Sequence, residues 1–492
     1  MNKSSHTPHP YAVSASALPR ATPSERHVDA GAISAWLDSI EAAGLELHAM
    51  MLWRKDAVVA EGWRWPYQPQ SRRMTHSVTK SVTACAIGLL VNEGRLSLDD
   101  RITSFFPEAK ATSGERTAKI TVRHLLEMRT GHASEVSGSI WRGIRTSWTD
   151  EFFRIPVVND PGTTYVYSSA ASYMLSAIVT RVTGETLHAY LRPRLFLPLG
   201  IHGEHWDIGP DGINPGGNGL SLTTEDMLRL GILHLQNGRW NGRTLLPASW
   251  VTAATQPQGT PTYGYHWVVG DGYYAALGVF VQAVLVFPEQ ESVLVLQGAM
   301  ENSAAILPHI RQYFPHALIA GGKASEDVAL RNRLLSWKKP PPIAPCENFP
   351  SQKGETRWHM HDNPLDISGI VLDTTPEMIR FTLVDSTGAH SIQCGLTDWI
   401  HGISTMPGAS LHHGYLLRDT PVVAGARWLS TDCLELVWHF PETAFRDTIT
   451  LRFSGTRLTL DREVNINSGD RHWPTLHADL LSFQEKTAGT PA

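Results

Sequence analysis

Within residues 26–337, strand-like segments stand at both ends and helical segments lie between them. Residues 30–43 have helical apolar spacing, and residues 48–53 and 57–63 then read as two strands around a turn. Helical patterns follow at 77–92, 122–127, 168–182 and 223–236, and strand-like patterns return at 263–269, 273–287 and 292–297. This order predicts an α+β domain whose antiparallel sheet is built from both ends of the segment, with a helical cluster in the middle.

The sequence Lys-Lys-Pro-Pro-Pro at 338–342 marks a change of pattern. Proline interrupts helices and cannot donate to a strand ladder, so we place a Pro-rich linker at 338–352. Strand-like stretches at 378–384, 433–440 and 448–453 then predict a C-terminal all-β domain over 353–492, as a small antiparallel barrel or sandwich. At the other end, residues 1–25 are rich in Ser, Pro, His and Ala, which predicts a disordered or loosely attached segment.

Length, charge and cysteine content exclude several classes of protein. A chain of 492 residues is too long for one ordinary core, and its formal net charge of −5 argues against a nucleic-acid partner. No stretch approaches the roughly 18 uninterrupted apolar residues of a membrane span. The four cysteines lie far apart and form no Cys-x-x-Cys pair, so we expect reduced thiols. These features predict a soluble cytoplasmic protein without a membrane partner.

Ser77 is the strongest candidate for a nucleophile. Lys80 follows it three residues later at the start of the predicted helix 77–92, so the two side chains share a helix face. The free N–H groups and the dipole of the first turn favour developing negative charge at Ser77. Burial of this apolar helix disfavours the charged form of a lysine, which can then act as the base that a serine nucleophile needs. The spacing Ser-x-x-Lys alone is weak evidence for a nucleophile and its base, because it is also compatible with a structural N-cap serine and a surface lysine.

Further segments in the same order make the chain resemble the serine β-lactamase and penicillin-binding-protein superfamily. The closest resemblance is to its class C-like branch of esterases, D-aminopeptidases and nylon-oligomer hydrolases, and it covers about residues 30–320. The segments are Ser77-Val78-Thr79-Lys80-Ser81, the run 88–100, the run 120–131, Tyr165-Val166-Tyr167-Ser168-Ser169, the run 238–243 and Pro288-Glu289. The resemblance implies a β-lactamase/transpeptidase-like antiparallel sheet with a helical cluster, and an acyl-enzyme mechanism.

The same resemblance assigns roles to further residues. Tyr167 matches the motif tyrosine, which implies a proton relay or general base beside Lys80. Ser169 stands where the family has an asparagine that contacts substrate. Ala276-Leu277-Gly278 stands where the family has Lys-Thr-Gly or a His-containing equivalent, so both polar groups of that motif are replaced.

The backbone of this strand can still supply part of the function of the replaced motif. Gly278 would keep the strand close to the substrate, and the amide of Val279 would pair with the amide of Ser77 as an oxyanion hole, which needs no side chain. Phe280 would form an apolar wall of the substrate pocket. An alternative is that 274–287 is only a core strand.

We therefore predict a serine hydrolase that cleaves an ester or amide bond of a small-molecule substrate through an acyl-enzyme on Ser77. One alternative is a β-lactamase or D-amino-acid peptidase of the same fold, and another is a catalytically inactive relative that binds a ligand or partner. No cofactor and no metal is expected, because His359 and His361 offer two nitrogens without a third ligand. A homo-oligomer is possible.

Overall fold

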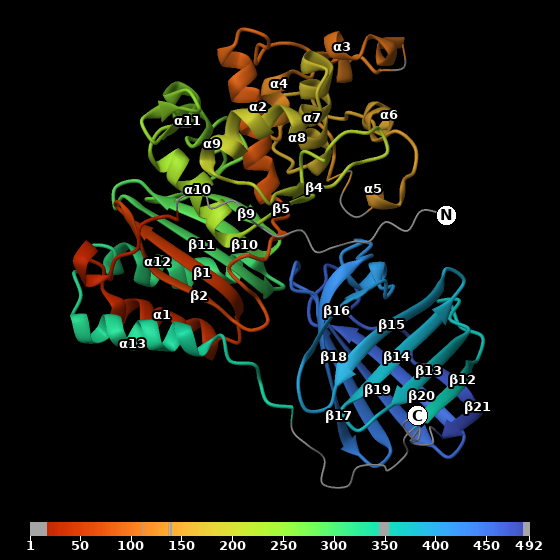
Figure 1. The fold of residues 1–492 in the computed structure, drawn as a ribbon. Helices are drawn as coiled ribbons and strands as arrows, with labels where there is room; N and C mark the ends of the chain where they lie inside the picture. The colour runs from red at the N-terminus through yellow and green to blue at the C-terminus, as the bar shows by residue number, and fades with distance from the viewer. Residues whose placement is uncertain (1–16, 112, 136, 138–139, 344–353, 486–492) are drawn as a thin grey trace.

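The computed structural model describes residues 17–485 except 112, 136, 138–139 and 344–353. Two large antiparallel β structures organise these residues (Figure 1). A six-stranded sheet with helices on both faces lies in the N-terminal part, and a ten-stranded sheet makes up the C-terminal part. The predicted fold class, an α+β domain followed by an all-β one, is confirmed.

The six-stranded sheet joins both ends of the N-terminal segment, as the sequence predicts. Its strand order is β2-β1-β11-β10-β9-β8, and Trp53 of β1 is paired with Val293 of β11. The bounds are β1 (Glu46–Arg54), β2 (Ala57–Trp63), β8 (Val268–Val269), β9 (Tyr274–Gly278), β10 (Phe280–Phe287) and β11 (Ser292–Met300). Five short strands form two smaller sheets: the three strands β3 (Arg73–Met74), β4 (His205–Trp206) and β5 (Leu220–Leu222), and the pair β6 (Arg239–Trp240) and β7 (Arg243–Thr244).

Helices cover both faces of this sheet and form a separate core on each side. On one face pack α1, α12 and α13, and the predicted apolar stripe of α1 is buried there. The other face carries α10 and the helical cluster that contains α2 and α7. The bounds of the helices are α1 (Ala30–Ala42), α2 (Val78–Asn92), α3 (Ile102–Phe105), α4 (Val122–Leu126), α5 (Ile140–Gly143), α6 (Trp148–Arg154), α7 (Ser169–Thr183), α8 (Leu187–Leu191), α9 (Leu197–Leu199), α10 (Thr224–Leu235), α11 (Ala248–Ala254), α12 (Ile306–Ala317) and α13 (Ala324–Ser336).

The single strand predicted over 273–287 is wrong, because the structure folds it into the hairpin β9–β10. Gly278 is paired with Gln282, and Phe280 and Val281 between them both have a φ of 64°. Positive φ at consecutive residues is typical of tight hairpin turns, where Gly or Asn usually stands. A β-branched valine rarely adopts this conformation, so the composition gave no sign of the turn.

The C-terminal part is a ten-stranded barrel whose strands are antiparallel to their neighbours in the sheet order, with one further, parallel pairing between β15 and β17. Its strand order runs β15-β14-β13-β12-β21-β20-β19-β18-β17-β16, and a further pairing of Gly395 with Gly425 joins β15 to β17. The strands are β12 (Gly354–Met360), β13 (Gly369–Thr374), β14 (Met378–Asp385), β15 (Gly388–Gly395), β16 (Ile400–Ser404), β17 (Thr420–Ser430), β18 (Cys433–His439), β19 (Arg446–Ser454), β20 (Arg457–Val464) and β21 (Leu476–Glu485). This is the antiparallel β structure that the alternating patterns predict.

The barrel contacts the N-terminal part directly. Arg73 donates to the carbonyl oxygen of Thr443 at 2.9 Å, and Arg446 forms an ion pair with Glu46 at 3.2 Å. Phe280 of β10 belongs to the same apolar cluster as the barrel interior. The barrel is therefore packed against the region around β3 and the β9–β10 hairpin.

The two predicted unstructured segments fall partly outside the described residues. Residues 1–16 and 344–352 lie there, so those parts of the predictions cannot be compared. Residues 17–25 differ from the predicted disorder: Leu18 is buried, and the N–H of Ala21 donates to the carbonyl oxygen of Val58 at 3.0 Å. The reason is that this stretch extends along β2, where it gains both backbone bonds and apolar burial.

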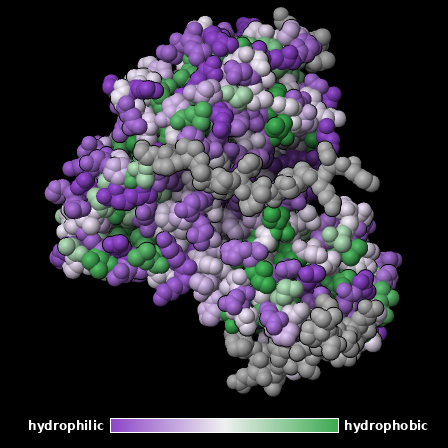
Figure 2. Space-filling model, viewed as in Figure 1, coloured by the Kyte–Doolittle hydropathy of each residue, from purple (hydrophilic) through white to green (hydrophobic). Residues whose placement is uncertain are grey.

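Most of the surface in Figure 2 is hydrophilic, with apolar residues in small scattered groups. Among the described residues, no helix has the length and apolar character needed to cross a membrane.

Candidate active site

Ser77 lies at the N-terminus of α2, where the chain arrives from β3. His76 before it has a φ of 49°, so the backbone turns sharply between the strand and the helix. The Ser77 side chain is half-buried and remains accessible. The amides of Val78, Thr79 and Lys80 donate to the carbonyl oxygens of Thr75, His76 and Ser77 at 3.2, 3.1 and 3.0 Å, so they are not the free N–H groups that the sequence predicts for the first turn.

Lys80 is 1% exposed, and its ammonium reaches three oxygen atoms. Its Nζ lies 3.1 Å from Oγ of Ser77, 3.0 Å from Oγ of Ser169 and 2.9 Å from the carbonyl oxygen of Gly217. All three acceptors are neutral, and an ammonium has three hydrogens to donate. The structure thus places Ser77, Lys80 and Ser169 together, and Ser169 holds Lys80 in addition to any contact with substrate.

Tyr167 completes this cluster from the loop before α7. Its ring centroid lies 4.7 Å from Nζ of Lys80, and its ring also contacts the buried Tyr263 edge-on at 6.3 Å. Tyr167 is 38% exposed, so a substrate can approach it from solvent. The predicted neighbourhood of Tyr167, Lys80 and Ser77 therefore exists in the structure.

Gly217 is a site residue that sequence reasoning missed. The glycine-rich run 216–219 reads as a structural loop, yet the carbonyl oxygen of Gly217 is one of the three acceptors of Lys80. A Cβ at Gly217 would lie 3.0 Å from the Cβ and from the carbonyl oxygen of Ser169, so a side chain there would push the loop away from α7. The run of glycines was the available signal, because it indicates close backbone approach.

Gly278 brings the end of β9 against the backbone before the nucleophile. A Cβ there would lie 2.5 Å from the carbonyl oxygen of Thr75 and 3.2 Å from Cβ of His76. Only glycine allows this approach, and the next residue is Val279. The oxyanion role of the Val279 and Ser77 amides remains a prediction, and this contact is the feature that supports it.

Phe280 does not form the predicted wall of a substrate pocket. Its side chain is buried, and its ring packs against His76 at 5.5 Å, His413 at 5.7 Å and Phe445 at 5.8 Å between ring centroids. The positive φ of the hairpin turn directs Phe280 into the interface with the barrel, where it supports the loop that carries Ser77.

Two buried histidines near the site are neutral. Burial, and then the positive charge of Lys80, lowers the pKa of His266 to about 3. Burial, followed by His413 and Arg142, holds the pKa of His76 well below its usual range. Because both rings are neutral at physiological pH, they add no positive charge to the neighbourhood of Lys80.

The described residues contain no group of three or more His, Cys, Asp or Glu side chains that could hold a metal ion. His361, one of the two histidines noted in the sequence, forms an ion pair with Asp479 at 3.0 Å on the surface instead.

The fold and the cluster of Ser77, Lys80 and Tyr167 define a serine hydrolase with a serine at a helix N-terminus and a buried lysine one turn later. The sequence profile named Beta-lactamase matches residues 38–299, and the chain belongs to this family.

Individual relatives agree with this class. The chain is 26% identical to the 6-aminohexanoate-dimer hydrolase of Paenarthrobacter ureafaciens over 312 residues, which cover 56% of this chain and 79% of the relative. It is 29% identical to the lovastatin esterase of Penicillium rubens over 169 residues, 30% of this chain and 42% of the esterase. A solved Bacillus anthracis structure assigned as a 6-aminohexanoate-dimer hydrolase has a TM-score of 0.52 at 19% identity, covering 62% of this chain and 88% of that one, which shows a shared fold.

Proposed function

We propose that this chain hydrolyses an ester or amide bond of a small molecule through an acyl-enzyme on Ser77. The observation that carries the proposal is the distance of 3.1 Å between Nζ of the buried Lys80 and Oγ of Ser77. A nucleophile within hydrogen-bond reach of a base, which other groups hold in turn, is the arrangement that covalent catalysis requires.

The reaction has two steps. In the first, Oγ of Ser77 attacks the carbonyl carbon while Lys80 accepts the hydroxyl proton. The amides of Ser77 and Val279 stabilise the negative charge on the carbonyl oxygen. Lys80 and Tyr167 then return the proton to the leaving group, and the acyl group stays on Ser77. In the second step the same groups take a proton from water as it attacks the ester carbonyl of the acyl-enzyme. The bond between the carbonyl carbon and Oγ of Ser77 then breaks, Oγ takes up that proton, and the acid is released.

The residues that differ from the family pattern favour a simple ester or amide over a β-lactam. Ser169 replaces the motif asparagine, and it is occupied by Lys80 at 3.0 Å. The strand segment Ala276-Leu277-Gly278 has no polar side chain that could bind a substrate carboxylate. The names of the two relatives, a lovastatin esterase and a 6-aminohexanoate-dimer hydrolase, also support this substrate class.

A fluorophosphonate probe with peptide mapping tests the nucleophile. We expect one labelled peptide, which contains Ser77, and no label in Ser77→Ala. In parallel, the purified chain is assayed with p-nitrophenyl acetate and with nitrocefin, and we expect hydrolysis of the ester only.

The outcomes distinguish the proposed function from a β-lactamase and from a binding relative. Labelling at Ser77 with nitrocefin turnover would favour a β-lactamase. A folded protein that is not labelled and hydrolyses neither compound would be a binding relative, and the proposed activity would be wrong. Ser81→Ala is a matched control, because Ser81 lies on the same helix but its hydroxyl donates to the carbonyl oxygen of His266 at 2.6 Å.

A further inference from the structure

The residues that lead into Ser77 run along the C-terminal barrel. The N–H of Met74 donates to the carbonyl oxygen of Glu442 at 2.9 Å, and the guanidinium of Arg73 donates to that of Thr443 at 2.9 Å. Arg73 is buried, so its contact with the barrel is shielded from water. The turn between β18 and β19 therefore holds β3 only a few residues before the nucleophile.

A second loop of the barrel encloses His76, the residue directly before the nucleophile. The ring centroids of Tyr415 and His413 lie 5.7 Å and 6.0 Å from that of His76. The hydroxyl of Tyr415 lies 3.5 Å from Nδ1 of His76, and the guanidinium carbon of Arg142 lies 3.5 Å from the centroid of the Tyr415 ring. Together with Phe280, these barrel rings leave His76 only 3% exposed.

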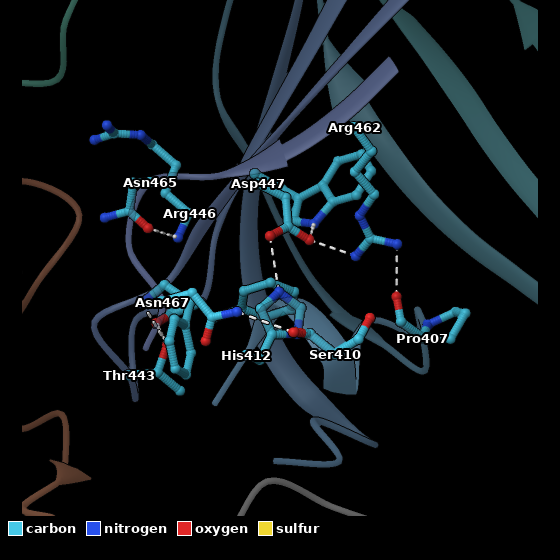
Figure 3. A network of polar contacts seen from close by, with 12 residues as sticks. Pro407, Ser410, His412, Thr443, Arg446, Asp447, Arg462, Asn465 and Asn467 are labelled. Atoms are coloured by element: carbon cyan, nitrogen blue, oxygen red, sulfur yellow. Dashed lines mark hydrogen bonds and ion pairs between the residues drawn. The ribbon is translucent and has the colours of Figure 1, made fainter. Parts of the chain in front are cut away.

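A buried network joins the two barrel loops (Figure 3). Oδ1 of Asp447, which follows the turn that contains Thr443, lies 2.8 Å from Nε2 of His412 in the second loop. Both side chains are completely buried. Oδ1 of Asn467 accepts from the N–H of His413 at 3.0 Å, which ties the second loop to the chain that follows β20. The two loops are thus connected to each other inside the barrel while both contact the segment before the nucleophile.

The backbone at His76 depends on these contacts. Its φ of 49° lies in the left-handed region, which is unfavourable for a residue with a side chain and persists only where the surroundings fix it. This turn sets the direction in which α2 begins, and hence where the hydroxyl of Ser77 points. That hydroxyl lies 3.1 Å from Nζ of Lys80, a distance that a small rotation of the turn would change.

We propose that Tyr415 and His413 are positioning residues for the nucleophile, so that the barrel completes the active site from the second part of the chain. They act through His76: their rings hold its side chain, and its side chain holds the left-handed turn that directs Ser77 towards Lys80. This inference rests on the proposed function, since it requires Ser77 to be a nucleophile.

The test compares barrel variants by two rates: fluorophosphonate labelling of Ser77, and kcat for p-nitrophenyl acetate. Tyr415→Ala removes one ring from His76. We expect both rates to fall at least about tenfold while KM changes less than about threefold, because a misplaced nucleophile loses rate rather than binding. Tyr415→Phe keeps the ring and should restore both rates to within about threefold of those of the unmodified chain.

His413→Asn tests the same route without disturbing the contact of Tyr415 with Arg142. Asparagine tolerates the φ of 54° at this position, so the loop keeps its backbone conformation. We expect both rates to fall here as well, which assigns the effect to His76 rather than to Arg142.

Leu383→Ala is the matched control for stability. Leu383 is completely buried in the barrel, but its strand β14 is paired with β13 and β15. This variant should unfold at a lower urea concentration, as Tyr415→Ala does, and keep both rates of the folded protein. A Tyr415 that only stabilises the barrel would behave in the same way as Leu383.

The outcomes separate this inference from the proposed function. Absence of labelling and of ester hydrolysis in the folded, unmodified chain would contradict the proposed function itself. If that chain is labelled and active, rates within about twofold of it in both Tyr415→Ala and His413→Asn would overturn the positioning role. If Tyr415→Ala does not fold, His413→Asn decides alone, because the side chain that it replaces is only half-buried.

Discussion

Replacing Lys80 by methionine should abolish most of the activity while leaving the protein folded. Methionine has nearly the same shape and fills the buried site, but it cannot accept the proton of Ser77. A positioned general base contributes about 10²–10⁴ in rate. At 1.36 kcal/mol per factor of ten, we expect the activation barrier to rise by about 3–5 kcal/mol.

The stability effect follows from opposing contributions. The variant loses three hydrogen bonds from the ammonium, to Ser77, Ser169 and Gly217. A hydrogen bond to a charged group contributes about 1.5–3 kcal/mol. Against this, removing a buried ammonium relieves a desolvation penalty of several kcal/mol. We therefore expect the free energy of unfolding to change by no more than about 2 kcal/mol.

The assay is hydrolysis of p-nitrophenyl acetate, with urea unfolding of the same samples. Lys80→Arg serves as a second variant, because arginine keeps the charge but does not give up its proton in proteins. If Lys80 acts as a base, both variants lose activity. Ester hydrolysis by Lys80→Met within about tenfold of the original chain would refute the reasoning, because such a small loss is below that of a general base.

Three further predictions concern single side chains. Tyr167→Phe keeps the ring beside Lys80 but removes the hydroxyl, and we expect kcat to fall about 10²-fold with KM little changed; a fall of less than about threefold would contradict a proton relay. Gly278→Ala places a Cβ 2.5 Å from the carbonyl oxygen of Thr75, so it should lower the free energy of unfolding in urea by about 1–3 kcal/mol and slow fluorophosphonate labelling. Gly469→Ala is the control, because a Cβ there has no atom within 4 Å, and it should change neither quantity. Burial raises the pKa of Asp226 to about 6 from 3.8, so the folded state holds this proton more tightly and loses stability as pH rises through that range. Asp226→Asn should therefore stabilise the protein by up to about 3 kcal/mol at pH 7.5 and by almost nothing near pH 4, and equal effects at both pH values would contradict this origin.

Local apolar patterns in the sequence predicted the helices and strands that bury one face in the core. The stripe of Ile33, Trp36, Leu37 and Ile40 is buried in α1 as expected. Ser77 and Lys80 could be recognised because a spacing of three on a helix fixes their relation before any tertiary contact forms.

Contacts between distant segments were beyond sequence reasoning. The hairpin at Phe280 depends on positive φ at residues that carry no turn signal, and the contact of Arg142 with Tyr415 joins two parts of the chain without a shared pattern. Gly217 contacts Lys80 through its backbone carbonyl oxygen, and every residue has such a group. The glycine at this position therefore indicates only that there is little room for a side chain.

The pairing of β1 with β11 has a consequence for synthesis on the ribosome. Trp53 can pair with Val293 only after about 240 further residues have been synthesised, so this part of the sheet cannot close before then. At about 5–20 residues per second, that interval is roughly 12–50 s, during which β1 has β2 on one edge and no partner on the other. An unpaired apolar strand edge is a template for aggregation. The nascent chain is therefore expected to depend on chaperones until residue 300 has emerged, and closure of the sheet to limit the rate of folding.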